Sequence, residues 1–457
     1  MTAIAFESLA QVAATLQESL RLRGERQPDT VAYVFLRDGE APEEMLTYRQ
    51  LGSAARARGL PQRGGLGGGA AVLLYPSGLE FVSTLLACMY AGIAGAPVQV
   101  PTRRSGMQRV RRIADDAGTS TMLTTSAVKR ELEESFGGLP ELAGLTLLGT
   151  ESMRDFSAGD WAWTAPGPDG IALLQYTSGS TGDPKGVEVT HANFRSSVAE
   201  TVELWPVRSD GTVVNWLPLF HDMGLMFGVV MPLWSGIPAY LMAPQAFIRR
   251  PARWLEAISW FRGTHAAAPS FAYERCVRSA LDAGLSPGLD LSSWRVAVNG
   301  AEPVRWATVR AFTQAYAPAG FRPQAMCPGY GLAENTLKLS GGPEDREPTL
   351  LCLDAEALQE GRVVPLAGSE PGGVAVVGCG VTVGSSHVSV ADPATGTAQP
   401  ADRVGEIWIN GPCVARGYHG GRRTARRSSV PGSSGRSGTA PGCGPVTWAS
   451  CTAARSS

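Results

Sequence analysis

Short apolar runs and segments of helical periodicity alternate along the N-terminal part of the chain. Residues 31–36, 70–75 and 92–100 are apolar runs bounded by turn residues, a pattern that predicts buried strands. Between them, residues 79–90 predict a helix, and residues 7–23 place apolar side chains along one stripe of an amphipathic helix. Strands that alternate with helices predict an α/β architecture with a mainly parallel sheet.

The alternation continues beyond an acidic connection that contains Gly and Pro. Residues 171–174 predict another buried strand, and Thr190 is a suitable cap for a following helix. Residues 213–219 and 296–299 predict two more strands, and residues 388–411 are typical of hairpins in a smaller β region. The pattern therefore predicts a mainly parallel α/β architecture followed by a smaller β region.

One uncharged stretch has the length of a membrane span. It runs from Met223 to Gln245, but Pro232, Pro238 and Pro244 interrupt any single helix there. We therefore expect no membrane span, and predict instead a buried strand–turn–helix region beside an apolar pocket.

Composition narrows the class of protein. The 457 residues carry a formal net charge of −1, which argues against a nucleic-acid surface. The eight cysteines never occur as Cys-x-x-Cys, so neither a zinc site nor a disulfide framework is indicated. The N-terminus lacks the charged-then-apolar pattern of a secretion signal. We therefore expect a protein of the reducing cytoplasm.

The clearest candidate chemistry follows the strand at 171–174. Residues 176–186 read YTSGSTGDPKG, with three glycines, four hydroxyl side chains and Lys185. Glycines let backbone N–H groups converge into a nest that binds anions, and a lysine adds a point charge for a phosphate. The loop is not a Walker A sequence, because Asp183 and Pro184 separate Gly182 from Lys185. The alternative is a plain flexible spacer, which does not require a lysine at this position.

These residues resemble the phosphate loop of the adenylate-forming superfamily. The sequence WLPLFHDMGL around His221 is similar to the corresponding motif of fatty acyl-AMP ligases. The resemblance covers most of residues 7–419 and implies the large N-terminal domain of that fold, with two layered α/β subdomains and a small β region. It implies that the loop binds ATP phosphates through Thr177, Ser178, Gly179, Ser180, Thr181, Gly182 and Lys185. His221 would orient the substrate carboxylate or the acyl phosphate. The alternative is that His221 and Asp222 only pair and cap a helix.

Two later motifs appear in the order of the same family. The segment PGYGLAEN, residues 328–335, implies that Tyr330 stacks on adenine and that Gly331, Leu332 and Ala333 line the nucleotide. Glu334, with Thr181, would hold the magnesium ion that bridges the phosphates. A carboxylate beside ATP is useful only through such a metal. The turn formed by Asn299, Gly300, Ala301 and Glu302 would frame the adenosine, unless it is a simple β-turn.

The implied activity is the activation of a fatty acid by ATP and Mg²⁺, with pyrophosphate release, for transfer to an acyl carrier protein. Residues 341–377 resemble the extra segment of fatty acyl-AMP ligases, although an ordinary surface elaboration would look the same. Three alternatives remain: an acyl-CoA synthetase, an amino-acid adenylation domain, and a non-catalytic protein that binds nucleotide or acyl-adenylate.

The resemblance stops after Tyr418. Residues 420–457 are rich in Gly, Ser and Arg and contain no Asp or Glu, which predicts a disordered tail. The family continues there with an Arg-Thr-Gly-Asp-Leu motif and a mobile C-terminal domain that carries a catalytic lysine. Codons compatible with residues 438–457 permit a similar motif in a shifted frame. We therefore expect a frameshift or truncation after Tyr418, and a feeble or inactive chain as a result.

Overall fold

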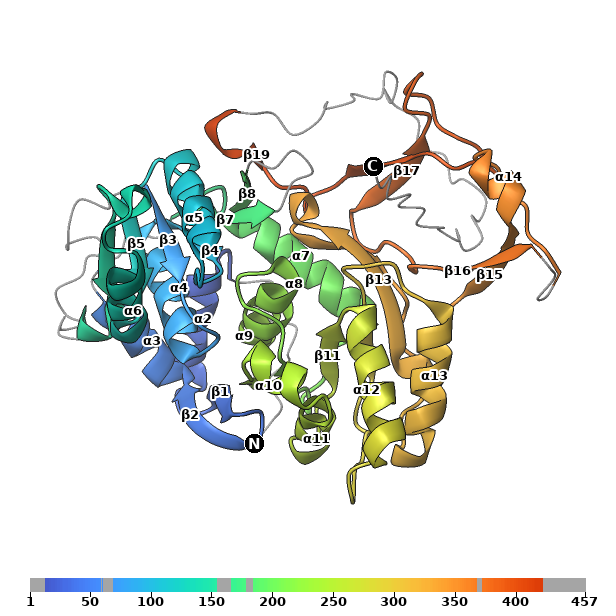
Figure 1. The fold of residues 1–457 in the computed structure, drawn as a ribbon, viewed down its shortest axis with the longest axis horizontal. Helices are drawn as coiled ribbons and strands as arrows, with labels where there is room; N and C mark the ends of the chain where they lie inside the picture. The colour runs from blue at the N-terminus through green and yellow to red at the C-terminus, as the bar shows by residue number, and fades with distance from the viewer. Residues whose placement is uncertain are drawn as a thin grey trace.

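A computed structural model of the chain describes residues 13–58, 60, 69–153, 166–177, 184–367 and 372–421. Figure 1 shows two neighbouring α/β parts, with the small strands β15, β16 and β17 beside them. Most of the phosphate loop, residues 178–183, and nearly all of the tail, residues 422–457, lie outside the described residues. Of the expected N-terminal helix, residues 7–12 also lie outside them.

The first part is built on a seven-stranded sheet with the order β19-β8-β7-β4-β3-β5-β6. Strands β3 to β7 run parallel, and β8 and β19 extend the sheet in antiparallel fashion. The strands are β3 Ala70–Leu74, β4 Ala94–Val98, β5 Thr121–Thr124, β6 Thr146–Gly149, β7 Ile171–Thr177, β8 Lys185–Thr190 and β19 Gly417–Tyr418.

The second part is built on an eight-stranded sheet with the order β14-β13-β12-β11-β9-β10-β1-β2. Its inner strands are parallel, and the pairs β13–β14 and β1–β2 at its two edges are antiparallel. The strands are β1 Val31–Arg37, β2 Ala41–Thr47, β9 Val213–Asn215, β10 Ala239–Leu241, β11 His265–Ala268, β12 Val296–Asn299, β13 Met326–Leu332 and β14 Leu337–Gly341.

Helices cover both sheets. They are α2 Leu16–Arg26, α3 Tyr48–Ala57, α4 Leu79–Ala91, α5 Arg104–Asp116, α6 Ser126–Phe136, α7 His191–Leu204, α8 Asp222–Leu225, α9 Met231–Ser235, α10 Pro244–Arg249, α11 Ala252–Trp260, α12 Ser270–Ala283, α13 Trp306–Tyr316 and α14 Ala355–Gln359. Thr190 caps α7, as the sequence predicted, and the structure adds a capping box with Asn193.

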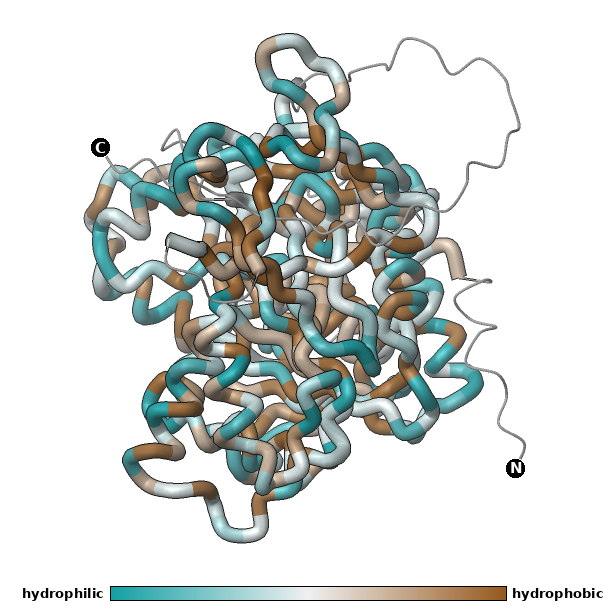
Figure 2. The backbone as a smooth tube through the Cα atoms, turned by 90° about the vertical axis from the view of Figure 1, so that its right-hand side faces the viewer, coloured by the Kyte–Doolittle hydropathy of each residue, from teal (hydrophilic) through white to brown (hydrophobic). Residues whose placement is uncertain are grey.

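Two apolar cores result from the alternation of side chains along the strands. In β3, Leu73 belongs to the large core that the two parts share, whereas Val72 and Leu74 face a second core against α5 and α6. Successive side chains of a strand point to opposite faces, so a fully apolar strand supplies both cores at once. Figure 2 shows the apolar segments concentrated in the interior.

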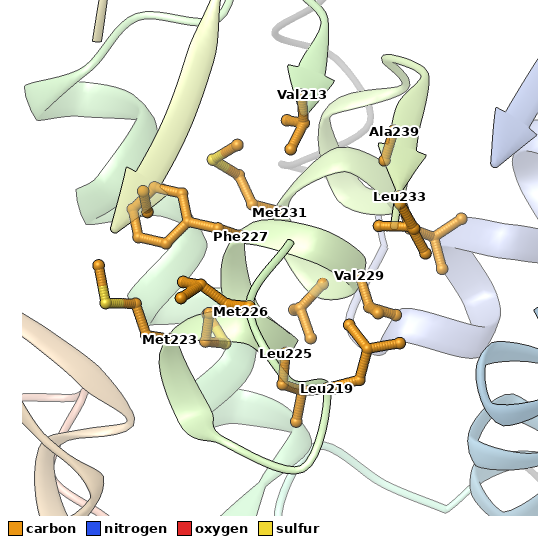
Figure 3. Close-up of a cluster of buried hydrophobic side chains, with 14 of the residues drawn as sticks. Val213, Leu219, Met223, Leu225, Met226, Phe227, Val229, Met231, Leu233 and Ala239 are labelled. Carbon is orange, nitrogen blue, oxygen red and sulfur yellow. The ribbon is translucent and has the colours of Figure 1, made fainter. Parts of the chain in front are cut away.

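The uncharged stretch after His221 forms a broken helical run. Helix α8 continues into a π-helical turn, Met226–Val230, and then into α9, where Pro232 stands in the first turn. Figure 3 shows apolar side chains of this run, among them Met223 and Phe227, gathered into one cluster. Among the residues that the structure describes, no helix combines the length and apolar character needed to cross a bilayer.

Two small antiparallel hairpins follow β14. Strand β15, Leu350–Asp354, pairs with β16, Gly373–Val377, and helix α14 lies between them in sequence. Strand β17, His387–Ala391, pairs with β18, Glu406–Asn410, close to the hairpin that the sequence predicted. The segment 341–377 thus forms a hairpin with its own short helix; whether it affects the choice of acyl acceptor stays a prediction.

Candidate functional site

Two cavities meet at the loop before α8. The inner cavity, about 180 Å³, lies between Trp205, Met223 and Phe227 on one side and Tyr330 and Lys338 of the β13–β14 pair on the other. The outer cavity, about 550 Å³, is lined by residues 97–109 and by the end of β7. His221 and Asp222 line both cavities. A ligand with an apolar and a polar half would therefore have its junction beside this pair.

Strand β7, which leads into the phosphate loop, lines the outer cavity with Gln175 and Tyr176. Strands β7 and β8 are antiparallel neighbours, and Thr177 pairs with Lys185 where the loop leaves and re-enters the sheet. Gly186 leaves room for the ring of Tyr176, because a Cβ there would lie 2.8 Å from the Tyr176 Cζ atom. Lys185 is half-buried at the end of the loop. The loop residues Ser178 to Gly182 lie outside the described part, so their phosphate contacts stay a prediction.

Lys185 and Glu334, from motifs far apart in the sequence, are joined by one aromatic residue. The Lys185 Nζ atom lies 5.7 Å from the centroid of the Tyr418 ring, within the range of a cation–π contact. The Tyr418 hydroxyl donates a hydrogen bond of 2.6 Å to Glu334 Oε1. Burial and the neighbouring Glu334 carboxylate raise the pKa of the Tyr418 phenol to about 12. Tyr418 therefore stays a hydrogen-bond donor throughout the neutral pH range.

The position of Tyr418 depends on β19. Tyr418 pairs with Val187 of β8, and the neighbouring His419 contacts Glu188 of the same strand at 2.9 Å. The backbone N–H of Ala415 donates to the Glu334 carbonyl at 2.8 Å. The chain segment around β19 therefore clamps the Glu334 turn against the phosphate-loop hairpin.

The surroundings of Glu334 fit a magnesium ion held partly by a ligand. Across the described ranges, no three His, Cys, Asp or Glu side chains gather closely enough to bind a metal on their own. Mg²⁺ is commonly bound by one or two carboxylates together with substrate phosphates and water. A ligating carboxylate is usually held by a further hydrogen bond, which is what Tyr418 supplies to Glu334. The donor set therefore fits a metal that arrives with a nucleotide.

His221 and Asp222 do pair and cap α8, which is the alternative that the sequence left open. His221 Nδ1 lies 2.7 Å from Asp222 Oδ1, and Met223 N donates to Asp222 Oδ1 at 2.6 Å. The Asp222 hydrogen bond raises the pKa of His221 against the opposing effect of burial. The His221 side chain is 52 % exposed and faces both cavities. A role for it at a carboxylate stays a prediction.

The turn after β12 is held in an unusual backbone conformation. Ala301 has φ +63°, a left-handed conformation that costs an L-residue about 1–2 kcal/mol. A Cβ on Gly300 would lie 2.8 Å from the Gly329 carbonyl oxygen, so this turn packs tightly against β13. The Glu302 carboxylate accepts a 2.6 Å hydrogen bond from Phe271 N at the start of α12. Glu302 therefore anchors the turn, while Gly300 and Ala301 line the inner cavity.

Strand β13 presents the second motif to the inner cavity. Tyr330 and Gly331 line it, and the neighbouring Ala333 lines the outer cavity. A Cβ on Gly331 would lie 1.9 Å from the Leu337 carbonyl oxygen, so only glycine allows β14 to pair this closely. Of the predicted site residues, the structure thus brings together Lys185, His221, Gly300, Ala301, Tyr330, Gly331, Ala333 and Glu334.

Sequence reasoning missed two residues of the site. Tyr418 lies in a segment that was matched to the family motif but was given no role. Trp205, at the end of α7, forms the apolar wall of the inner cavity with Phe227, their ring centroids 5.9 Å apart. The Trp205 indole donates to the Gly342 carbonyl at 2.8 Å, which fixes the orientation of the ring. No local signal marked Trp205, because its contact with β14 spans more than a hundred residues of sequence.

Comparison with known proteins finds a family model and relatives that match most of the chain. The family model described as "AMP-binding enzyme" matches residues 20–419. The chain is 40 % identical over 411 residues to the medium-chain-fatty-acid–[acyl-carrier-protein] ligase JamA of Moorena producens, covering 88 % of this chain and 69 % of the relative. It is 33 % identical over 432 residues to the long-chain-fatty-acid–AMP ligase FadD32 of Mycolicibacterium smegmatis, covering 91 % of this chain and 67 % of the relative.

A solved structure shares the fold of this chain. The fatty acyl-adenylate ligase of L. pneumophila, in complex with acyl adenylate and pyrophosphate, superposes with a TM-score of 0.85 at 33 % identity. The match covers 91 % of this chain and 72 % of that protein. The layered α/β architecture expected from the sequence is thereby confirmed.

Proposed function

The chain belongs to the AMP-binding enzyme family, and from this we propose that it activates a fatty acid with ATP, forming an acyl-adenylate and releasing pyrophosphate. One observation carries the proposal: Tyr418 joins Lys185 and Glu334, and Ala333, next to Glu334, lines the outer cavity, which shares His221 with the apolar inner cavity. A cation for phosphates, a held carboxylate for a metal and an apolar recess are the three features that this reaction requires.

The reaction needs no protein nucleophile. A carboxylate oxygen of the fatty acid attacks the α-phosphorus of ATP, and the bond from that phosphorus to the bridging oxygen breaks. Lys185 would stabilise the negative charge that develops on the departing β- and γ-phosphates. Glu334 would hold Mg²⁺, which supplies charge neutralisation on the phosphate oxygens when bound. Tyr330 and the turn at Gly300 would hold the adenosine, so catalysis consists of positioning and charge stabilisation.

The apolar part of the inner cavity, at Trp205 and Phe227, is the proposed acyl site, whereas Tyr330 and Gly300 line the part proposed for the adenosine. Each buried CH₂ group contributes roughly 0.8 kcal/mol, so the Trp205 and Phe227 wall would provide much of the affinity for the acyl chain. The neighbouring outer cavity shares His221 with it, and this position supports a role for His221 at the substrate carboxylate.

We further propose that an acyl carrier protein accepts the acyl group and that the protein works in the cytoplasm. The support for the acceptor is the printed function of the relative JamA, an acyl-carrier-protein ligase, and the support for the compartment is that the described cysteines form no disulfide. Thioester formation on coenzyme A, but not on a carrier protein, would replace this acceptor by the acyl-CoA alternative.

The experiment is pyrophosphate release from ATP with fatty acids of increasing length, paired with binding of acyl-sulfamoyl adenosine by calorimetry. Lys185→Ala should lower the adenylation rate by about 10²–10³, the scale of removing one key electrostatic contact. Lys129→Ala, a surface lysine whose side chain is 39 % exposed, is the matched control. An unchanged rate in Lys185→Ala would contradict the assignment. Tight binding without turnover would favour the non-catalytic alternative.

A further inference from the structure

The side-chain amide of Asn193 forms four hydrogen bonds within the protein. Asn193 stands in the first turn of α7 and is 7 % exposed. Its Oδ1 atom accepts from Thr190 N and from Thr190 Oγ1, each at 2.9 Å. Its Nδ2 atom donates to the carbonyls of Pro412 at 2.9 Å and of Val414 at 3.0 Å. The amide therefore contacts its own helix on one side and a segment far away in the sequence on the other.

The cap of α7 accounts for only half of this amide. The capping box requires an acceptor at this position, and a carboxylate oxygen serves as well as an amide oxygen. Acidic side chains are also favoured in the first turn of a helix by the helix dipole. The helix therefore explains Oδ1 of Asn193, whereas the Nδ2 donors serve the distant segment. One substitution can separate these two roles.

The distant segment, residues 411–416, contacts the carboxylate residue proposed to hold Mg²⁺. The carbonyl of Val414 and the N–H of Ala415 belong to one planar peptide group. Asn193 Nδ2 holds the carbonyl of this group, and the N–H of the same group donates to the Glu334 carbonyl at 2.8 Å. Fixing one side of a planar group fixes the other side. Asn193 therefore fixes the donor that holds the Glu334 backbone.

The backbone after Glu334 needs such support. Thr336 and Leu337 have φ +52° and +99°, conformations that such residues keep only when their surroundings impose them. Thr336 Oγ1 donates to the Cys413 carbonyl at 2.8 Å, which ties the strained turn to the same distant segment. Tyr418 follows this segment, and its hydroxyl donates to Glu334 Oε1. The segment thus supports both the backbone and the carboxylate of Glu334.

We propose that Asn193 is a positioning residue for the metal site, because through residues 411–416 it sets the position of Glu334 for Mg²⁺. The inference rests on the proposed function, since it takes Glu334 as the carboxylate that holds the metal. Asn193 is not among the described residues that line the two cavities. It therefore acts on Mg²⁺ through Glu334 and not by direct contact.

The experiment measures ATP binding to the full chain by calorimetry, with and without saturating Mg²⁺. Its readout is the gain in ATP affinity that Mg²⁺ produces. Asn193→Asp keeps an oxygen that accepts from Thr190 and removes the donors to residues 411–416. The gain should fall by about 3- to 10-fold, at or below the lower end of the range for direct partners of a metal ligand. The affinity for metal-free ATP should stay unchanged, because the proposed nucleotide contacts are not altered.

Further variants keep the test decisive where Asn193→Asp lowers stability. Thr336→Val removes the hydrogen bond to Cys413, leaves Asn193 in place and should lower the same gain. Gln50→Ala is the matched control, because Gln50 holds the same position in the capping box of α3, and it should leave the gain unchanged. In Asn193→Asp/Tyr418→Phe the combined loss should be smaller than the product of the two separate losses, because both changes act through Glu334.

Three outcomes overturn the inference. If Mg²⁺ raises the ATP affinity of wild type and of Asn193→Asp equally, Asn193 does not position Glu334, and the proposed function stands. An equal loss of ATP affinity with and without Mg²⁺ assigns Asn193 to the fold and not to the metal site. If the wild type binds no ATP in the presence of Mg²⁺, the proposed function fails together with the inference.

Discussion

The bridge between Lys185 and Glu334 makes a sharp prediction for Tyr418→Phe. The change removes one hydroxyl and keeps the ring, so the contact with Lys185 Nζ at 5.7 Å remains. What is lost is the 2.6 Å hydrogen bond to Glu334 Oε1. Glu334 is the residue that we expect to hold Mg²⁺, and the hydroxyl is the group that orients its carboxylate. We therefore predict that Tyr418→Phe lowers the affinity of the site for Mg²⁺ and leaves the contacts to the nucleotide and to the acyl chain intact.

The magnitude follows from the kind of bond. A hydrogen bond to a charged group contributes about 1.5–3 kcal/mol, and mutating the partner of a metal ligand costs about 10–100-fold in affinity or activity. Glu334 is only half-buried, so water replaces part of the lost bond. We therefore expect about a 10-fold increase in the Mg²⁺ concentration needed for half-maximal adenylation. Because the pKa of Tyr418 is raised to about 12, its hydroxyl stays protonated at neutral pH. The difference in Mg²⁺ requirement between Tyr418→Phe and wild type should therefore stay constant from about pH 6 to about pH 9.

The assay is a Mg²⁺ titration of adenylation, or of ATP binding, at fixed ATP and fatty acid. Tyr240→Phe is the matched control, because Tyr240 is half-buried on β10, stacks on Phe261 and does not line either cavity. Identical Mg²⁺ curves for Tyr418→Phe and wild type would refute the reasoning. An equal loss at every Mg²⁺ concentration would show that Tyr418 acts on the fold or on Lys185 instead.

Further predictions concern the cavity, the strand pair and two buried histidines. Trp205→Ala should shift the chain-length profile of adenylation toward longer acids and lower the unfolding free energy by about 3–5 kcal/mol. Gly331→Ala would put a Cβ 1.9 Å from the Leu337 carbonyl, so nucleotide binding measured by calorimetry should be lost. Burial lowers the pKa of His191 and of His265 to about 4. Below a pH of about 6.5 the unfolded state therefore binds more protons than the folded state. The free energy of unfolding, measured by denaturant titration, should fall as the pH is lowered from there toward about pH 4. At about pH 5 the loss should be about 1–2 kcal/mol per histidine. A flat profile would contradict the last prediction.

Elements with a strong local pattern could be predicted from the sequence. The Thr190 cap of α7 and the apolar strand β3 depend on neighbouring residues, and both formed as expected. Strand β2 was not predicted, because it is mostly exposed, contains Pro42 and two glutamates, and is paired only with β1. The predicted strand at 213–219 ends at Asn215, where the Asn215 side chain accepts a hydrogen bond from Leu217 N and turns the chain. In both cases the apolar pattern was not decisive: β2 is held by its pairing with the preceding strand β1, and the strand at 213 is ended by the Asn215 hydrogen bond.

The sequence by itself determined the fold class, the family resemblance and the identity of residues such as Lys185 and Glu334. These depend on residue type and on short-range order along the chain. Only the tertiary structure decided that Tyr418 joins those two residues and that Lys338 is buried in the cavity wall without a hydrogen-bond partner. The physical reason is that burial and hydrogen bonding depend on which surfaces meet: β19 on β8, and β14 beside α7. No local pattern of side chains specifies such contacts.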